Sequence, residues 1–184
     1  MIPMVVDRAL TLDEAYRITV DGLRNLGWKD MALDSKNRGI NSRFEGENDI
    51  WELLIHFHTK EMYQVISRSS WKVNNNTSDL VQHLVEKIDT DNSKHVFRMN
   101  DNGSFEVKTT TNIPEKIVFL EELKKNMISN IHAYESYAGM LKRFVNIGPK
   151  FLDKETEDFR ALITSKNQSM MIQNEELIRL KLQK

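Results

Sequence analysis

Hydrophobic and polar positions follow two different periods along the 184 residues of the chain. Near its start, apolar residues recur at the three- and four-residue steps of a helix. Thr11 and Glu14 have the spacing of a capping box, and Gly27 is the residue type that commonly ends a helix in a left-handed conformation. These signals predict a first helix that begins near Leu12, with Trp28 placed to pack under its end.

Between Gly39 and Trp71 the period of the pattern changes to two. Three runs, at residues 40–44, 51–57 and 63–71, alternate apolar with polar side chains, and short polar turns separate them. Consecutive strands joined by short turns favour antiparallel pairing. This part of the chain therefore predicts an antiparallel meander of three strands.

The next elements follow from local signals of the same kind. Ser78 can cap an amphipathic helix that runs to about Ile88, and the turn at residues 100–103 joins two further strands into a hairpin. Pro114 is well placed at the start of a long helix. The predicted order is α-β-β-β-α-β-β-α, an α+β fold with an antiparallel five-stranded sheet and helices mainly on one face.

A break at residues 146–149, Asn-Ile-Gly-Pro, predicts a boundary between a domain of residues 1–145 and a helical extension of residues 146–184. The apolar stripe of the extension includes residues at three- and four-residue steps, among them Phe159, Ile163, Met170 and Leu177. Such a helix either packs on its own domain or a second copy, or binds another protein. The break in the chain permits both arrangements.

Composition excludes several classes of function. The formal net charge of -1 gives no electrostatic reason to expect nucleic acid or an acidic membrane as partner. The chain has no cysteine, which excludes disulfides, thiolate catalysis and cysteine-ligated metal sites. It has no apolar run long enough to span a bilayer, and its first apolar stretch is too short for a signal peptide. We therefore expect a cytoplasmic protein.

Candidate chemistry is sparse. His56 and His58 lie two apart on a predicted strand, so both side chains share one face and could bind a metal. No third ligand is assured within reach, and a polar outer strand face accounts for the pair more simply. The sequence has neither the nucleophile motif G-x-S-x-G nor the nucleotide-binding motifs G-x-G-x-x-G and Walker A. We expect no catalytic residue, no metal and no cofactor.

Four segments of the chain resemble the YbjN-like family and the wider group with the fold of type III secretion chaperones. They are LGW at 26–28, the strand pair IWELLIHF and MYQVISRSSW at 50–71, the helix SDLVQHLVEKI at 78–88, and the hairpin HVFRMNDNGSFEVKTTTNI at 95–113. The resemblance covers roughly residues 8–142 and consists of fold signatures. It implies a small cytoplasmic binder, and the secretion chaperones are homodimers that hold a client segment on their surface.

We therefore expect a non-enzymatic protein-binding module, chaperone-like or adaptor, that forms a homodimer. Partner apolar surface would be buried against the open sheet face, at Leu54, Ile66 and Arg68, and against the stripe of the C-terminal helix. One alternative is a regulatory subunit of a larger bacterial signalling or defence assembly. A less favoured alternative is a metal-dependent enzyme at His56 and His58.

Overall fold

The structure is a computed structural model that describes residues 10–46, 49–59, 61–73, 77–90, 94–145, 154, 156–158 and 160–166, with the backbone alone at residue 90. Within these ranges the helices and strands follow one another along the chain as α1 (Leu12–Asn25), β1 (Met31–Asp34), β2 (Gly39–Glu45), β3 (Ile50–Thr59), β4 (Met62–Ser69), α2 (Ser78–Thr90), β5 (Val96–Met99), β6 (Phe105–Asn112) and α3 (Phe119–Arg143). The predicted α+β class with an antiparallel sheet is confirmed.

The sheet has six strands in the order β1-β2-β3-β4-β6-β5, and every neighbouring pair is antiparallel. The prediction of five strands is wrong because it omitted β1. This strand has four residues, of which three are exposed, so it lacks the alternation that marks a half-buried strand. It forms because the turn after it is fixed locally: the Asn37 amide donates to Asp34 Oδ1 and Arg38 adopts a φ of 53°.

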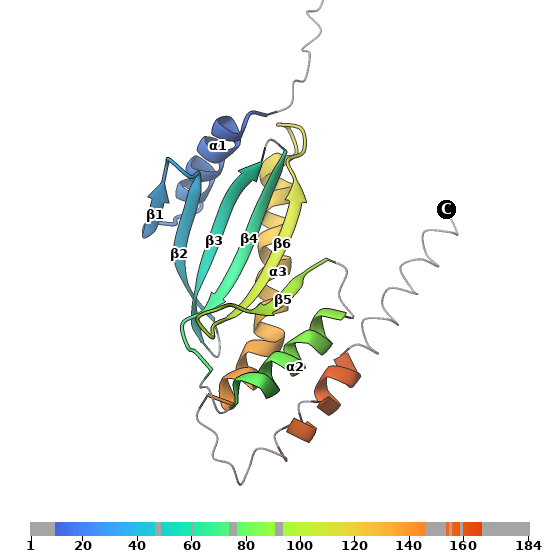
Figure 1. The fold of residues 1–184 in the computed structure, drawn as a ribbon. Coiled ribbons are helices and arrows are strands. Elements are labelled where there is room, and N and C mark those ends of the chain that lie inside the picture. Colours follow the sequence, from blue (N-terminus) through green and yellow to red (C-terminus); the bar gives the residue numbers. More distant parts are fainter. Residues whose placement is uncertain are drawn as a thin grey trace, which may run out of the picture.

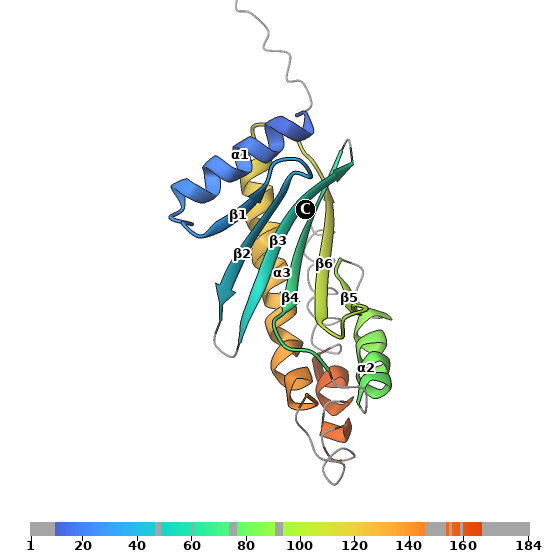
Figure 2. The ribbon, with the colours of Figure 1, turned by 60° about the vertical axis from the view of Figure 1, so that its left-hand side comes forward.

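The helices α1 and α3 cover one face of the sheet. In Figure 1 the sheet lies in front of α3, which runs along β4 and β6, while α1 lies behind the β1–β2 end. The helix α2 packs beside β5 at the opposite end, and the turned view of Figure 2 shows the same arrangement. Among the described residues, no helix covers the face of β2, β3 and β4 that points toward the viewer in Figure 1.

Local signals define the ends of α1 as predicted. Thr11 and Glu14 form the capping box, and Gly27 has a φ of 89°. The amides of Gly27 and Trp28 donate to the carbonyls of Arg24 and Leu23, which completes a Schellman motif. The start of α3 was predicted less well: residues 116–118 form a turn, and the helix begins five residues after the proline.

Aromatic side chains fill the core between the sheet and α3. Trp51 and Trp71 are buried, as their strand phase predicted, and Trp51 stacks on Tyr134 with ring centroids 4.8 Å apart. Asp49, in the turn before β3, accepts hydrogen bonds from Trp71 Nε1 at 2.7 Å and from the Tyr134 hydroxyl at 3.1 Å. Lys142 Nζ lies 2.9 Å from the same carboxylate. One carboxylate thus joins this turn to the end of β4 and to α3.

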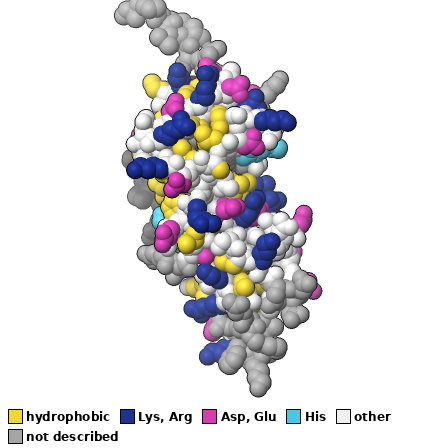
Figure 3. All heavy atoms as spheres, turned by 90° about the vertical axis from the view of Figure 1, so that its left-hand side faces the viewer, with side chains coloured by type: hydrophobic (Ala, Val, Ile, Leu, Met, Phe, Trp, Pro, Cys, Tyr) yellow, Lys and Arg dark blue, Asp and Glu magenta, His cyan; other side chains and the backbone are white. Residues whose placement is uncertain are grey.

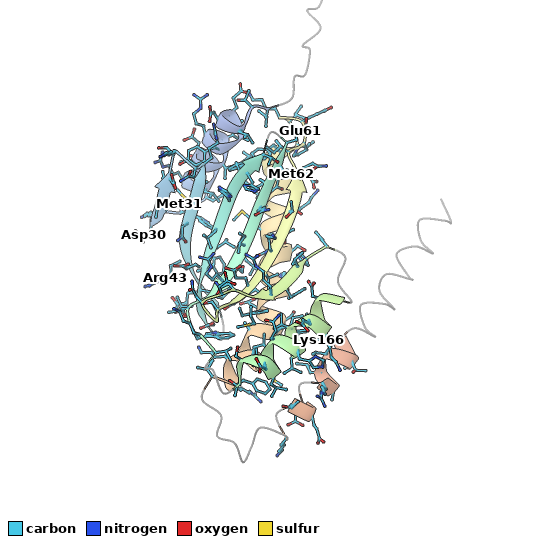
Figure 4. The ribbon with its side chains drawn as sticks, viewed as in Figure 1. Asp30, Met31, Arg43, Glu61, Met62 and Lys166 are labelled. Atoms are coloured by element: carbon cyan, nitrogen blue, oxygen red, sulfur yellow. The ribbon has the colours of Figure 1, made fainter. Side chains whose placement is uncertain are left out.

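The described part of the C-terminal extension packs against the domain. Ile163 is 6 % exposed and joins the buried cluster that contains residues of α2 and α3. Lys166 Nζ donates to the Ser136 carbonyl at 2.6 Å and lies 5.0 Å from the centroid of the Tyr137 ring; Figure 4 labels Lys166. In this region the extension docks on its own chain. In the described ranges, no helix has both the length and the apolar character required of a membrane span.

Candidate functional site

The helix-free face of the sheet carries a groove of about 450 Å³. The two-residue period of β3 and β4 points Trp51, Leu53 and Ile55 toward α3, so the residues between them point outward. Leu54 and Ile66 are directly paired in the register of these strands, and both side chains are half-buried. They form the apolar floor of the groove.

The strand missed by the sequence analysis supplies one wall of this groove. Ala32 and Leu33 of β1 line it, and both are exposed. The polar part of the lining consists of Asp34, Asn37, Asn41, His56 and Arg68. Figure 3 shows the side of the molecule that faces left in Figure 1, where hydrophobic side chains gather between charged ones over its upper half. The groove thus combines an aliphatic floor with a polar rim.

Next to the groove, side chains of alternating charge cross five strands in register. Arg43 of β2 is paired with Glu52 of β3, Glu52 with Arg68 of β4, Arg68 with Glu106 of β6, and Glu106 with Arg98 of β5. We call these five residues the charged ladder. Opposite charges on directly paired strand positions stabilise the pairing of the strands.

The carboxylate of Glu106 is the buried centre of this ladder, with 1 % of its side chain exposed. Arg68 Nε lies 2.6 Å from Oε1, Arg98 Nη2 lies 2.7 Å from Oε2, and Asn100 Nδ2 donates at 3.1 Å. Burial by itself raises the pKa of the Glu106 carboxyl, but the hydrogen bonds from Arg68, Arg98 and Asn100 outweigh it and hold the pKa below 4.5. Arg68 therefore stabilises the fold in addition to lining the groove.

A second, more polar hollow of about 520 Å³ lies beside the groove. Arg43, Arg68 and Lys72 line it together with Glu52, and serine and asparagine residues complete its polar lining. The two hollows share Arg68. In the part of the chain that the structure describes, neither Arg43 nor Lys72 belongs to an ion pair. Both cations are therefore available to a negatively charged group.

The histidine pair lies on the same outward face. The rings of His56 and His58 are 5.3 Å apart between centroids, and His56 lines the groove. Among the described residues, no three His, Asp, Glu or Cys side chains gather in an arrangement that could hold a metal ion. The pair contributes polar surface at the rim of the groove.

A buried serine–histidine contact lies on the other side of the sheet. Ser129 Oγ is 3.1 Å from His95 Nε2, and Thr109 Oγ1 is 2.8 Å from His95 Nδ1. A hydrolytic triad has an aspartate or glutamate at the second nitrogen, where this chain has a threonine. Burial, with a smaller contribution from Lys94, lowers the pKa of His95 to about 4. The imidazole is therefore neutral at neutral pH.

Asn130 of α3 extends this network into the centre of the sheet. Its side-chain nitrogen donates to the carbonyls of Val65 and Val107 and to Thr109 Oγ1, at 2.9–3.1 Å, and its oxygen accepts from Ser67 at 2.7 Å. All four groups belong to β4 and β6. The network fixes the position of α3 on the sheet, which is a structural role.

The predicted site residues are thus only partly brought together. Leu54, Ile66 and Arg68 line one groove, as the outward strand phase predicted. Ile163 is buried in the core and so is not presented on the surface. Three further residues of the predicted stripe lie outside the described residues: Phe159, Met170 and Leu177.

Two cations were missed by the sequence analysis. Arg43 follows the outward phase of β2, so the alternation that selected Leu54 could have selected it. Lys72 comes after the end of β4 and has no strand phase, so only the folded chain shows that it lines the same hollow as Arg43. Figure 4 labels Arg43 on β2, at the lower end of the sheet.

Within the described ranges, the fold and the groove define an α+β protein whose sheet is covered by helices on one face only. No protein-family model matches the chain, and no curated protein matches it in sequence. The function is therefore argued from the geometry of the helix-free face.

Proposed function

We propose that this protein is a non-enzymatic binding module, chaperone-like or adaptor, that holds a segment of another protein against the helix-free face of its sheet. The observation that carries the proposal is the groove over Leu54 and Ile66. A partner that covers these aliphatic side chains removes their remaining surface from water. This burial stabilises the complex by about 25 cal/mol per Å² of apolar area.

The order of the elements supports this proposal. Apart from β1, the chain follows the order α-β-β-β-α-β-β-α, which the resemblance to the YbjN-like family and the secretion chaperones implies. Members of that group are generally small binders, and the secretion chaperones hold a client segment on their surface. We include membership of this group, and homodimer formation, in the proposal.

Site-specific photo-crosslinking in the native host tests the proposal. A photoreactive amino acid in place of Leu54 reports what lies against the groove, and the same amino acid in place of Lys124 provides the control. Lys124 is exposed on α3, in the helix layer that covers the other face of the sheet. We expect covalent adducts with another protein from the Leu54 position and none of these adducts from Lys124.

The pattern of adducts separates the two forms of the proposal. Several substoichiometric adducts indicate a chaperone with a class of clients, whereas one stoichiometric partner indicates a subunit of a fixed assembly. The proposal would be contradicted if the Leu54 position formed no adduct with another protein in cells. It would also be contradicted if the Leu54 and Lys124 positions gave identical adducts. A thermal unfolding curve of each variant, compared with that of the parent protein, shows whether the fold has been retained.

A further inference from the structure

We propose that the groove and the adjacent polar hollow recognise one kind of segment: an extended, acidic stretch in which a carboxylate lies two residues from a large aliphatic or aromatic side chain. This inference rests on the proposed function and names its partner class. The two hollows are adjacent, since Arg68 lines both of them. A single short segment can therefore occupy both.

The apolar half of the site accepts the hydrophobic side chain of the segment. Leu54 and Ile66 form its floor, and Ala32 and Leu33 bound it on the side of β1. None of the large hydrophobic side chains exposed among the described residues is aromatic. A single-stranded nucleic acid needs aromatic side chains on which its bases stack, so this surface fits a peptide better.

The charged half of the site selects the carboxylate. Arg43, Lys72, Arg68 and Arg98 supply four positive charges here, whereas Glu52 and Glu106 supply two negative charges. The local excess of positive charge contrasts with the net charge of -1 on the whole chain. Because Glu52 and Glu106 together balance Arg68 and Arg98, the excess resides at Arg43 and Lys72. Complementary charge steers a partner into register on such a surface.

The spacing of the two halves sets the spacing within the segment. The paired residues Leu54 and Ile66 lie two positions along β3 and β4 from the paired residues Glu52 and Arg68. Two positions along a strand correspond to about 7 Å. In an extended peptide, side chains at positions i and i+2 also lie on one side, about 7 Å apart. An apolar residue over the groove thus brings a carboxylate at i+2, or at i−2, over the Glu52–Arg68 pair. This position lies in the hollow that Arg43 and Lys72 also line.

A library of random peptides of about twelve residues, selected on the immobilised full-length protein, tests this inference. We expect enrichment of sequences with Asp or Glu two positions from Leu, Ile, Met or Phe. The enriched peptides are then synthesised, and their Kd is measured by fluorescence anisotropy. Reversing both free cations, Arg43→Glu with Lys72→Glu, should weaken binding by about tenfold or more, since like charges then face the carboxylate.

Two variants complete the design. Leu54→Asp removes the apolar floor and should also weaken binding by about tenfold or more. Lys124→Glu changes the net charge by the same amount per substitution but lies on α3, away from the site, and should alter the Kd by less than about twofold. Arg43, Lys72 and Lys124 are all exposed, so these substitutions leave the core intact.

Each outcome decides a separate point. Peptides without an acidic residue, or binding that survives the double reversal but not Leu54→Asp, would overturn the acidic segment and leave the binding module standing. Failure to select any peptide would count against both. A poly-dT oligonucleotide that binds more tightly than any selected peptide would overturn the choice of a protein partner. A synthetic peptide of residues 167–184 that outcompetes every selected peptide would assign the groove to this chain's own C-terminal segment.

Discussion

His95 makes the stability of this fold depend on pH in a window that can be calculated. Its imidazole is buried between β6 and α3, where Thr109 and Ser129 contact its two nitrogens. Burial lowers its pKa from 6.5 to about 4, so the folded chain resists protonation that the unfolded chain accepts. Protons therefore bind the unfolded state preferentially, and the free energy of unfolding falls as the pH decreases from 6.5 toward 4.

The magnitude follows from the two pKa values. The titration of His95 lowers the free energy of unfolding by about 2 kcal/mol at pH 5 and about 3 kcal/mol at pH 4, relative to its value at pH 7. Carboxylates titrate over part of this range, so the contribution of His95 has to be isolated by difference. We propose the substitution His95→Asn, which retains a polar group near Thr109 but has no proton to gain in this range.

Urea unfolding between pH 7.5 and pH 4.5, followed by circular dichroism, measures this difference. We expect His95→Asn to be less stable than the parent protein at pH 7.5, and the difference in stability between the two to narrow by about 2.5 kcal/mol at pH 4.5. His83→Asn, at an exposed position on α2, should run parallel to the parent protein. A gap that stays constant with pH would refute the assignment of the titration to buried His95.

Three further predictions concern stability measured by urea unfolding. Glu106→Gln should cost about 1–3 kcal/mol because two arginines lose a buried counter-ion, whereas Glu52→Gln, at a half-exposed carboxylate, should cost less than about 1 kcal/mol. Gly46→Ala should cost about 1–3 kcal/mol because its Cβ would lie 2.5 Å from a buried indole carbon; at Gly39 the nearest atom is 3.6 Å away, and no such loss is expected there. Ile163→Ala should cost about 2–5 kcal/mol if the extension unfolds with the domain, and equal stability would contradict the docking of this segment.

Elements whose signals are local were predicted well from the sequence. The capping box and the left-handed Gly27 define α1 by contacts between residues a few positions apart, and the alternation from residue 51 to 57 fixes which face of β3 is buried. The strand β1 was missed because pairing with β2 stabilises it, while its own residues carry no strand pattern. Its four residues form a strand only through pairing with β2, and a polar turn of the chain brings them there.

In the candidate site, too, features that follow from one strand were predicted, whereas features that depend on several strands were not. Strand phase alone predicted that Leu54, Ile66 and Arg68 share a face, and they line one groove. Glu106 lies on the outward phase of β6, between Phe105 and Val107, and yet its side chain is buried. The carboxylate is buried because arginines from both neighbouring strands and Asn100 from the hairpin turn close over it. Side chains of several strands bury Glu106 together. The hydrophobic period of one strand therefore cannot predict this burial.

The double role of Arg68 decides how the helix-free face has to be tested. Its guanidinium both lines the groove and holds the buried carboxylate of Glu106 at 2.6 Å. Removing it leaves a buried charge with one arginine instead of two, so an Arg68 variant loses stability whether or not a partner binds there. Loss of binding in that variant would therefore say nothing about recognition. Arg43 and Lys72 have no ion pair among the described residues, so reversing their charge changes what the surface attracts without exposing a buried charge. An unfolding curve of the double variant measures the cost of placing Arg43→Glu opposite Glu52 in the register of β2 and β3.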